Sequence, residues 1–535
     1  MKKRLSAVIS LVLFLGAMVA PGSASSPSYD VVVIGAGGGG LSAAARISLS
    51  GMKVLLIEQH YKVGGYMTNF ERGDYTFEVS LHAINGMDPH CGMTRRTFEE
   101  LGIMDKIKPV RLLKPYRIVM PDFELDVPAD PHEYMKLLKN RFPHENKGID
   151  KFFRIVSSME HAIVMQKAGK EGDGGRAMKL YLENPFFAVP MIKYANKSLA
   201  DLLDDCVDDE KLKAVLSWMC GYGGAPPQQM PALLFMGMWA DYHFGGFYYF
   251  EGGSQSISDA LADVVRSNGG EVLLSTMAEK IVIKDGKAVA VRTGDGSEYA
   301  CRYVVSNASA PATLFELTGE EHLPDNYVEQ VKSMEIGPSA FQVYLGVDRD
   351  YTPDFNGAHT ISVFESYELS SLVNSADPEN QGYFIVNYSV ADPTAAPQGK
   401  NVIVFTTYLP YDWKNGWHEN ESYMKYEKLK KETAMTFIKR AEKYLPGLSS
   451  HIEVMEVGSP RTMEHFTLNP QGAIYGWDIN REQTFNKRLE QETPIENLYL
   501  AGAWTRPGHG QSAVLSSGIM AAEKIIENDG HKEHQ

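Results

Sequence analysis

The pattern of apolar and polar positions near the start of the chain predicts a parallel βαβ unit. Residues 29–34 form an apolar run rich in β-branched side chains, which is typical of a strand buried on both faces. A glycine run follows, and small residues from Leu41 to Leu49 then indicate a closely packed helix. The next apolar run, from Lys53 to Glu58, predicts the second strand of the unit.

A second segment predicts more α/β structure of the same compact kind. It begins at Phe250 and continues as a helical stretch to Ser267. Strand-like patterns then cover Glu271 to Val291 and Tyr303 to Asn307. Within the first of these, Asp285-Gly286 separates two apolar runs and predicts the turn of a β-hairpin.

A third segment lies near the C-terminus. Residues 497–502 predict a strand that ends in a glycine-rich turn, and a helix with many small residues follows from about Ser512 to Asn528. The three segments look like parts of one nucleotide-binding domain, and the insertions between them are richer in aromatic residues and methionine. We assign the nucleotide-binding segments to residues 28–89, 250–315 and 461–530. We assign the substrate domain to residues 90–249, which form its substrate and lid part, and to residues 316–460.

The first 24 residues predict a signal peptide. Three basic residues precede an apolar run from about Leu5 to Val19, and Gly22 and Ala24 supply the small residues of a cleavage site. We expect cleavage after Ala24 and export to the periplasm or the cell exterior. The alternative is an uncleaved anchor, but the run has only about 15 residues and a spanning helix needs roughly 20.

Composition excludes some partners. A chain of 535 residues with 44% apolar content is long enough for two or three domains with sizeable cores. Its net charge of −15 argues against a nucleic-acid partner, because binding to a polyanion depends on lysine and arginine. The four cysteines show no metal-binding spacing, so we expect buried free thiols, with one disulfide bond as the alternative. They are Cys91, Cys206, Cys220 and Cys301.

The strongest chemical signal is the glycine run between the first strand and helix. Gly35, Gly37 and Gly40 fit the GxGxxG pattern, in which glycines allow a tight turn, close approach of a pyrophosphate, and helix–strand packing. Glu58 ends the next strand, 18 residues after Gly40, where a carboxylate can hold a ribose diol. A structural glycine turn is the alternative for the run alone, but its position before a helix favours phosphate binding.

Motifs beyond this loop carry a family resemblance. Gly64-Gly65 and the segment Phe77 to His82 follow Glu58, and the C-terminal turn reads Tyr499 to Gly510. Together they resemble the FAD-dependent superfamily of phytoene desaturases, carotenoid cis-trans isomerases and retinol saturases, whose broader relatives are the flavin-containing amine oxidases. Similar motifs recur at residues 245–253, 303–307, 392–400 and 469–476, so the resemblance covers nearly all of the chain after residue 24.

The resemblance implies an α/β fold with FAD as cofactor. A Rossmann-like FAD-binding domain of the glutathione-reductase/amine-oxidase type would be assembled from the three discontinuous segments, beside a mixed α+β substrate domain. Two positions depart from many relatives: Ser80, where a glycine is common, and Ala503, where an acid is common. By matching position, the resemblance implies cofactor-binding roles for Gly35, Gly37, Gly40, Glu58, Gly65, Met67, Ala278, Gly502, Ala503, Ser512 and Ala513.

The same resemblance implies chemistry at carbon–carbon bonds. Its members desaturate, saturate or isomerise apolar chains, and the flavin supplies the reactive atom while the protein supplies orientation and electrostatics. Polar candidates beside the flavin are His82, Arg506 and His509, because each lies within a flavin motif. For His82 the alternative is a structural hydrogen-bonding role, and for Arg506 a surface or phosphate-positioning role.

We expect an isoprenoid, carotenoid-like or fatty-acyl substrate. Residues 180–192 and 231–239 are rich in aromatic residues, leucine and methionine, and predict an apolar tunnel whose lid touches a membrane. Their alternative is ordinary core. Three other functions stay open: an amine oxidase with an aromatic cage drawn from Tyr475, Trp477 and Trp504, a non-catalytic FAD-stabilised lipid-binding protein, and a nicotinamide-linked dehydrogenase. The sequence predicts no metal site and does not identify the electron acceptor.

Overall fold

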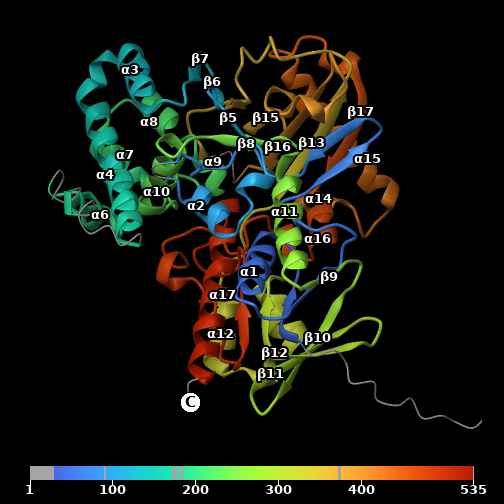
Figure 1. The fold of residues 1–535 in the computed structure, drawn as a ribbon. Coiled ribbons are helices and arrows are strands. Elements are labelled where there is room, and N and C mark those ends of the chain that lie inside the picture. Colours follow the sequence, from blue (N-terminus) through green and yellow to red (C-terminus); the bar gives the residue numbers. More distant parts are fainter. Residues whose placement is uncertain are drawn as a thin grey trace, which may run out of the picture.

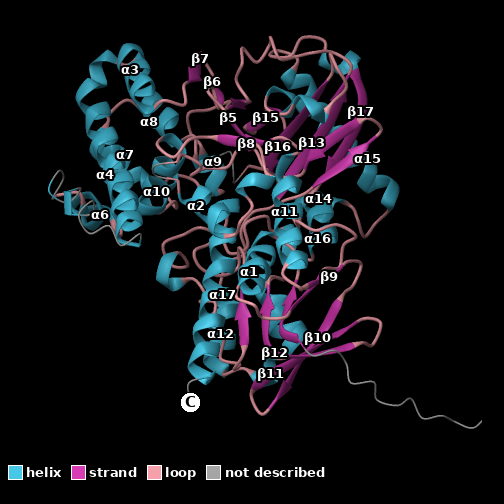
Figure 2. Ribbon diagram, in the orientation of Figure 1, coloured by secondary structure: helices cyan, strands magenta, loops and turns pink. Residues whose placement is uncertain are grey.

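Two seven-stranded sheets form the body of the protein. The structure is a computed structural model that describes residues 29–89, 92–170, 178–179, 182, 186–370 and 375–533. One sheet lies at the bottom of Figure 1, with α1 (Gly38–Leu49) above it and α17 (Gln511–Glu533) along its left side, and the other lies at the upper right. A group of helices occupies the upper left (Figures 1 and 2). The predicted signal peptide and Cys91 lie outside the described residues.

The lower sheet takes strands from all three nucleotide-binding segments. Its order is β10-β11-β12-β1-β2-β9, and β18 also pairs with β12. The pairs that β1 makes with β2 and β12, and the pairs β2–β9 and β12–β18, are parallel. The strands are β1 (Tyr29–Ile34), β2 (Val54–Ile57), β9 (Glu271–Leu273), β10 (Ala278–Lys284), β11 (Lys287–Thr293), β12 (Glu298–Ser306) and β18 (Leu498–Leu500).

Burial on both faces explains the apolar run of β1. Val31 and Val33 join the core that contains α1 (Gly38–Leu49), whereas Val32 and Ile34 face the core on the opposite side of the sheet. The predicted strand matches β1 in full, and α1 begins three residues earlier than the predicted helix. Helix α17 (Gln511–Glu533) packs along α1, where Ser42 Oγ donates a hydrogen bond to the Leu515 carbonyl at 2.9 Å.

The hairpin between β10 and β11 is also where the sequence predicts it. The two strands are antiparallel, with Lys284 opposite Lys287. Asp285 and Gly286 both have positive φ, 51° and 76°, which is the conformation that a two-residue turn between twisted strands requires. Aspartate and glycine reach this conformation at lower cost than most residues, so local chemistry determined this turn.

The sequence did not predict the individual strands of the upper sheet. Its order is β17-β13-β16-β15-β14-β6-β7, and it is antiparallel except where β14 pairs with β6. The strands are β6 (Tyr116–Met120), β7 (Phe123–Val127), β13 (Ala340–Val347), β14 (Thr360–Val363), β15 (Tyr383–Asn387), β16 (Asn401–Tyr408) and β17 (Ile452–Gly458). Two short pairs complete the strands: β3 (Asn69–Arg72) with β4 (Tyr75–Glu78), and β5 (Pro109–Arg111) with β8 (Tyr248–Phe250).

Strand alternation gives the upper sheet two different faces. Along β13, Phe341 and Val343 pack in the core that contains α15 (Tyr423–Ala441), while Gln342 points to the opposite face. Along β15 the same alternation sends Ile385 toward α15 and Phe384 to the opposite face. This second face forms one wall of the cavity described below.

Helices fill the rest of the described chain. The helices at the upper left of Figure 1 belong to the first insertion. They are α3 (Pro131–Arg141), α4 (Asn146–Lys170), α6 (Ala188–Tyr194), α7 (Leu199–Cys206), α8 (Glu210–Ser217), α9 (Cys220–Gly223) and α10 (Ala232–His243). The others are α2 (Met93–Glu100), α11 (Gly253–Ser267), α12 (Asp325–Ser333), α14 (Trp413–Trp417) and α16 (Pro460–Thr467). Over the described residues, no helix combines the length and apolarity needed to cross a membrane.

Three of the four cysteines can be placed. Cys206 and Cys220 are buried free thiols, and Cys301 is a half-buried free thiol in β12. Burial raises the pKa of the Cys206 thiol to about 11 and that of Cys301 to about 12. Both groups are therefore protonated and unreactive near neutral pH, as structural cysteines are expected to be.

Candidate functional site

The glycine loop forms the floor of a cavity of about 1110 Å³ that extends between the two sheets. Gly35, with φ of 87°, turns the chain out of β1, and Gly37, Gly38 and Gly39 line the cavity where α1 begins. The first backbone N–H groups of α1 are therefore available to an anion. Gly40 does not line the cavity; a Cβ there would come 1.9 Å from the Gly35 carbonyl oxygen, so its role is close packing.

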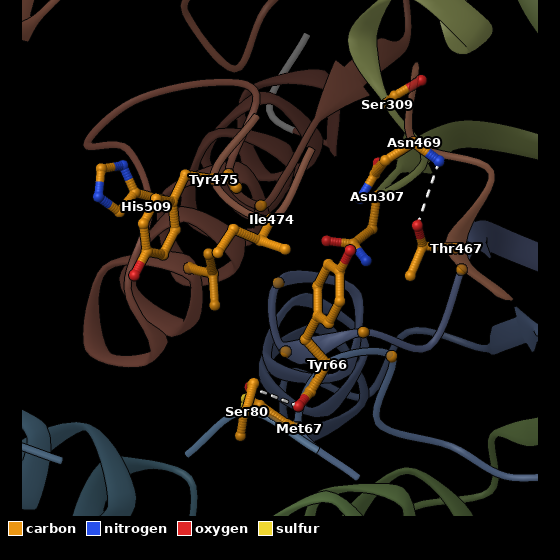
Figure 3. Close-up of a pocket in the computed structure, with 18 of the residues that line it drawn as sticks. Tyr66, Met67, Ser80, Asn307, Ser309, Thr467, Asn469, Ile474, Tyr475 and His509 are labelled. Atoms are coloured by element: carbon orange, nitrogen blue, oxygen red, sulfur yellow. Dashed lines mark hydrogen bonds between the residues drawn. The ribbon is translucent and has the colours of Figure 1, made fainter. Parts of the chain in front are cut away.

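The side chain of Asn307 explains why several of these positions are glycine. Asn307 follows β12 and points its amide into the loop (Figure 3). A Cβ on Gly37 would lie 2.7 Å from Asn307 Nδ2, and one on Gly39 or Gly502 would lie 2.6 or 2.5 Å from Asn307 Oδ1. Asn307 lines the cavity, and the sequence interpretation missed it as a site residue. Its signal was a polar residue at the carboxyl end of a parallel strand, where ligands bind in open α/β sheets.

Glu58 lies at the end of β2, on the cavity wall, where the sequence places it. Its Oε2 accepts a hydrogen bond from the Ala36 N–H at 2.7 Å, and its Oε1 accepts one from the His60 N–H at 2.8 Å. Burial raises the pKa of this carboxyl above its ordinary value, and the two backbone donors oppose that rise. Each oxygen keeps a further lone pair for a hydroxyl of a bound ribose.

The second glycine pair closes against the first loop. The Gly64 N–H donates to the Ala36 carbonyl at 2.8 Å, and a Cβ on Gly65 would approach the Gly37 Cα to 3.2 Å. Gly65 and Met67 both line the cavity, and so does Ala278 at the start of β10. Figure 3 shows Tyr66 and Met67 beside Ser80, whose hydroxyl donates to the Tyr66 carbonyl at 2.7 Å.

The C-terminal turn meets the same cavity from the other end of the chain. Gly502, with φ of 93°, and Ala503 line it directly. Ser512 and Ala513 lie in the first turn of α17 and are not among the residues that line it. Ser512 Oγ instead donates to Asn85 Oδ1 at 2.5 Å, which ties this turn to the loop after β4. The cavity wall therefore does not support the direct cofactor contacts predicted for Ser512 and Ala513.

One wall of the cavity carries no charged side chain. It is built by the upper sheet together with α9, α10 and the loops that carry His82 and Tyr475. By contrast, the carboxylates on the cavity wall, Glu58, Glu279, Glu316 and Glu464, come from other elements. We call this the uncharged wall; its residues are His82, Ala83, Gly221, Tyr222, Tyr242, Ala340, Gln342, Phe384, Thr406, Tyr408, Ile474, Tyr475 and His509.

His82 makes no hydrogen bond to any described residue. Its ring contacts Tyr222 and Phe384 edge-on, each at a centroid distance of 6.2 Å, and its Nδ1 is buried without a partner among those residues. Burial lowers the pKa of His82 to about 4, so the ring is neutral at physiological pH. The structural hydrogen-bonding role considered for His82 therefore does not describe this geometry.

His509 is held flat against Tyr475. The two rings stack with centroids 4.1 Å apart. Figure 3 shows the two side chains next to each other. Burial, together with the nearby Arg488 guanidinium, lowers the pKa of His509 to about 3. Arg488 is itself buried and donates to the Ala503 carbonyl at 2.6 Å, so it fixes the turn beside His509. His509 is thus a neutral ring on the cavity wall.

Arg506 lies away from the cavity. Its guanidinium pairs with Glu490 at 2.7 Å, and its Nε donates to the Arg488 carbonyl at 3.1 Å. Arg506 is not among the cavity-lining residues. The structure therefore does not support the predicted catalytic role and agrees with the alternative of a surface residue, because its charge is already engaged outside the site.

The described residues of the two predicted tunnel segments do not line this cavity either. Residues 231–239 lie mainly in α10, where Phe235, Met236 and Trp239 are buried in the helical core. In the other segment, Phe186 and Ile192 are 74% and 76% exposed. The alternative of ordinary core is correct for α10. Composition identified these segments as apolar, but it did not indicate which of their side chains would face the cavity.

The site fits an extended dinucleotide. The glycine floor leaves room for phosphates, Glu58 faces a ribose position, and Thr276, Met277 and Ala278 line the wall beside it. The volume also exceeds the roughly 300–1,000 Å³ that is typical of a pocket for one small molecule. The cavity can therefore hold a dinucleotide such as FAD together with a second molecule against the uncharged wall.

Comparison with known proteins agrees with this geometry. The family described as flavin containing amine oxidoreductase matches residues 39–526. The chain is 27% identical to a chloroplastic prolycopene isomerase of Daucus carota, over 98% of this chain and 84% of that protein. It is 25% identical to an all-trans-retinol 13,14-reductase of Danio rerio, over 88% and 82%. It is 24% identical to a 4,4'-diapophytoene desaturase of a Methylomonas species, over 93% and 95%.

Solved structures agree on the fold. An oxidoreductase from Methanosarcina mazei aligns with a TM-score of 0.60 at 19% identity, covering 93% of this chain and all of that one. A putrescine oxidase bound to putrescine aligns with a TM-score of 0.61 at 14% identity, covering 94% and 99%. At these identities the likeness establishes the shared architecture and leaves the substrate to the site itself.

Proposed function

The chain belongs to the flavin containing amine oxidoreductase family, and from that premise we propose that it acts on carbon–carbon bonds of a neutral, mainly apolar, elongated substrate. Membership makes it an FAD-dependent oxidoreductase, with FAD as its cofactor. Bound FAD accepts or donates a hydride, and the protein supplies binding, orientation and exclusion of water. The expected substrate is an isoprenoid, carotenoid-like or fatty-acyl chain, and the reaction is desaturation, saturation or cis-trans isomerisation.

The uncharged wall is the observation that carries this proposal. A protonated amine that entered the cavity would need a carboxylate or a matched aromatic cage, because burial of an unpaired charge is costly. The described wall contains neither an acid nor a base with a formal charge, since His82 and His509 are neutral. Its aromatic rings suit a conjugated or apolar chain that is held mainly by burial.

Of the three aromatic residues considered for an amine-oxidase cage, Tyr475 and Trp504 line the cavity and Trp477 does not. Tyr475 lies flat against His509, and its hydroxyl is 3.3 Å from that of Tyr408. Trp477 is buried and does not line the cavity, and its ring packs edge-on against Trp504, which does, with centroids 4.8 Å apart. The relatives that act on carotenoids and a retinoid, by their names, therefore guide the substrate proposal better than the amine oxidase structures do.

The proposal is tested by anaerobic incubation of the FAD-loaded protein with polyene and isoprenoid lipids, with the flavin oxidised in one arm and reduced beforehand by dithionite in the other. Flavin absorbance reports reduction in the first arm and reoxidation in the second. Product mass separates the three reactions: a loss of two hydrogens with oxidised flavin, a gain of two hydrogens with reduced flavin, or no change with altered double-bond geometry. Amines are run in parallel under air with detection of peroxide. Peroxide from amines, with no change in any lipid, would show that the protein is an amine oxidase.

We also propose export across the cytoplasmic membrane. The basic residues followed by an apolar run and small residues in positions 1–24 support it. N-terminal sequencing of the protein recovered from each cell fraction tests this proposal, and a chain that starts at Ser25 in an exported fraction is the expected result. Peripheral contact with a membrane stays a prediction.

A further inference from the structure

The uncharged wall contains a hydrogen-bonding group that a pure hydrocarbon could not satisfy. His82 lines the cavity, and neither of its ring nitrogens makes a hydrogen bond to a described residue. Nδ1 is enclosed by protein, so Nε2 is the nitrogen that is open to the cavity. A neutral imidazole carries one donor and one acceptor nitrogen. If only hydrocarbon lay against it, the ring would keep an unpaired polar atom, at a cost of about 1–3 kcal/mol.

The position of this ring is set by three separate elements. Tyr222 of α9 and Phe384 of β15 contact it edge-on. Tyr242 of α10 donates its hydroxyl to the Ala83 carbonyl at 3.0 Å, which fixes the backbone beside His82. A polar ring that is packed this firmly and yet makes no hydrogen bond to the described protein is poised for a ligand atom.

A second side chain on the cavity wall shows the same property. Gln511 begins α17, and both its Nε2 and Oε1 are buried without partners among the described residues. The loop of His82 and the first turn of α17 are tied together by the hydrogen bond from Ser512 to Asn85. Two polar side chains from linked segments therefore belong to the wall of the same cavity, His82 with a nitrogen open to it and Gln511 with its amide enclosed behind the surface.

We propose that the substrate carries an uncharged oxygen function, a hydroxyl or carbonyl, on its apolar chain, and that His82 binds this oxygen. This inference rests on the proposed function and narrows its substrate class to oxygenated chains over hydrocarbons. A neutral ring in a wall without formal charge favours an alcohol, aldehyde or ketone over a carboxylate or an amine, because neither ion would find a counter-charge there. His82 thereby acts as a substrate-anchoring residue.

The test compares two probes that differ only in the oxygen. All-trans-retinol and the polyene hydrocarbon that lacks only its hydroxyl are titrated into the FAD-loaded, oxidised protein in the absence of air, and affinity is read from the absorbance change of the polyene. We expect the alcohol to bind roughly 10- to 100-fold more tightly, because the hydrocarbon leaves His82 unpaired.

His82→Phe is the informative variant, because it keeps an aromatic ring and removes both nitrogens. It should lower affinity for the alcohol to that for the hydrocarbon and leave FAD content and the flavin spectrum unchanged. His144→Phe is the matched control: His144 is exposed, pairs with Asp209 at 2.8 Å and does not line the cavity. It should retain the preference of the wild-type protein.

Equal affinity of the wild-type protein for both probes overturns the inference. An altered flavin spectrum in His82→Phe with an unchanged preference also overturns it, because His82 would then serve the cofactor. The proposed function is judged separately, by turnover: preferential binding of the alcohol without any change at a carbon–carbon bond refutes the function and leaves the anchoring role of His82 in place. Binding of neither probe overturns the anchoring role of His82, and the proposed function is then decided by the lipid turnover assay alone.

Discussion

At the scale of single residues, the glycine loop is shaped around one amide. The glycine pattern is usually understood through phosphates, but Gly37, Gly39 and Gly502 also leave space for the Asn307 side chain. Asn307 lies at the end of β12, and its side chain lies against two flavin motifs: the glycine loop near the start of the chain and the turn at Gly502 near its end. A residue in this position contacts whatever lies over the loop, and its charge should therefore matter more than its size.

Asn307→Asp should weaken FAD binding by roughly tenfold or more, because a carboxylate of nearly the same shape would repel phosphates over the loop. FAD titration followed by flavin fluorescence measures the effect. Circular dichroism of the apoprotein should show an unchanged fold. Unaltered FAD affinity would mean that the phosphates do not pass over Asn307.

Asp241 in α10 makes stability depend on pH. Burial raises its pKa to about 7, and Asn85 Nδ2 donates to its Oδ2 at 2.6 Å. The native state thus holds a proton that the unfolded chain, with the ordinary value of 3.8, loses at lower pH. Between about pH 4 and pH 7 the unfolded state binds fewer protons, so this group lowers the free energy of unfolding as pH rises.

Asp241→Asn should remove that dependence. We expect the variant to have a Tm several degrees above that of the wild-type protein at pH 8, and a nearly equal Tm at about pH 3, where the native carboxyl and the unfolded carboxyl are both largely protonated. Differential scanning calorimetry at the two pH values measures the difference. A gap of the same size at both would show that Asp241 is ionised in the native state.

At the scale of elements, the contact between α1 and α17 positions the phosphate loop. Gly518 of α17 faces the first turns of α1, where a Cβ would lie 2.0 Å from the Gly39 carbonyl oxygen and 2.1 Å from Ser42 Oγ. The two helices therefore approach backbone to backbone. Since Gly39 is part of the cavity floor, the packing of these helices and the binding of FAD are coupled.

Gly518→Ala should lower the free energy of unfolding by roughly 1–3 kcal/mol and reduce FAD content, because α17 must move away from α1. Gly530→Ala in the same helix is the control: a Cβ there meets nothing within 4 Å. It should raise stability by about 0.5–1 kcal/mol, the usual effect of replacing glycine in a helix. Equal unfolding temperatures for the two variants would contradict this account.

At the scale of the whole molecule, the site joins segments that are far apart in the chain. Residues from the first strands, from the middle of the chain and from the C-terminal turn line one cavity. A ligand that contacts all of them binds only the folded state. FAD should therefore stabilise the protein by mass action, by about 2.7 kcal/mol at 100 times its Kd.

We expect the Tm of the apoprotein to rise by a few degrees when FAD is added. FMN, which lacks the adenosine portion, should give a smaller shift because it cannot reach Glu58 and Ala278 together with the C-terminal turn. Thermal unfolding with each cofactor measures both effects. An equal shift with FMN would show that the glycine loop and Glu58 do not contribute to binding.

The sequence by itself determined the parts whose chemistry is local. β1 and the turn at Asp285 follow from neighbouring residues, since burial on two faces demands an apolar run and a two-residue turn demands positive φ. The glycine loop and Glu58 followed from spacing. Family resemblance then extended these motifs to an FAD site, because the cofactor's shape imposes similar residues on distant relatives.

Only the tertiary structure decided what faces the cavity. The uncharged wall draws on Tyr222, Gln342, Phe384 and Tyr408, which no spacing rule connects, because strand alternation and helix packing choose the face that each side chain occupies. The tertiary structure also places Arg506 outside the site, where its guanidinium pairs with Glu490. Apolar content specifies that a residue is buried, but the contacts of distant segments specify what it is buried against.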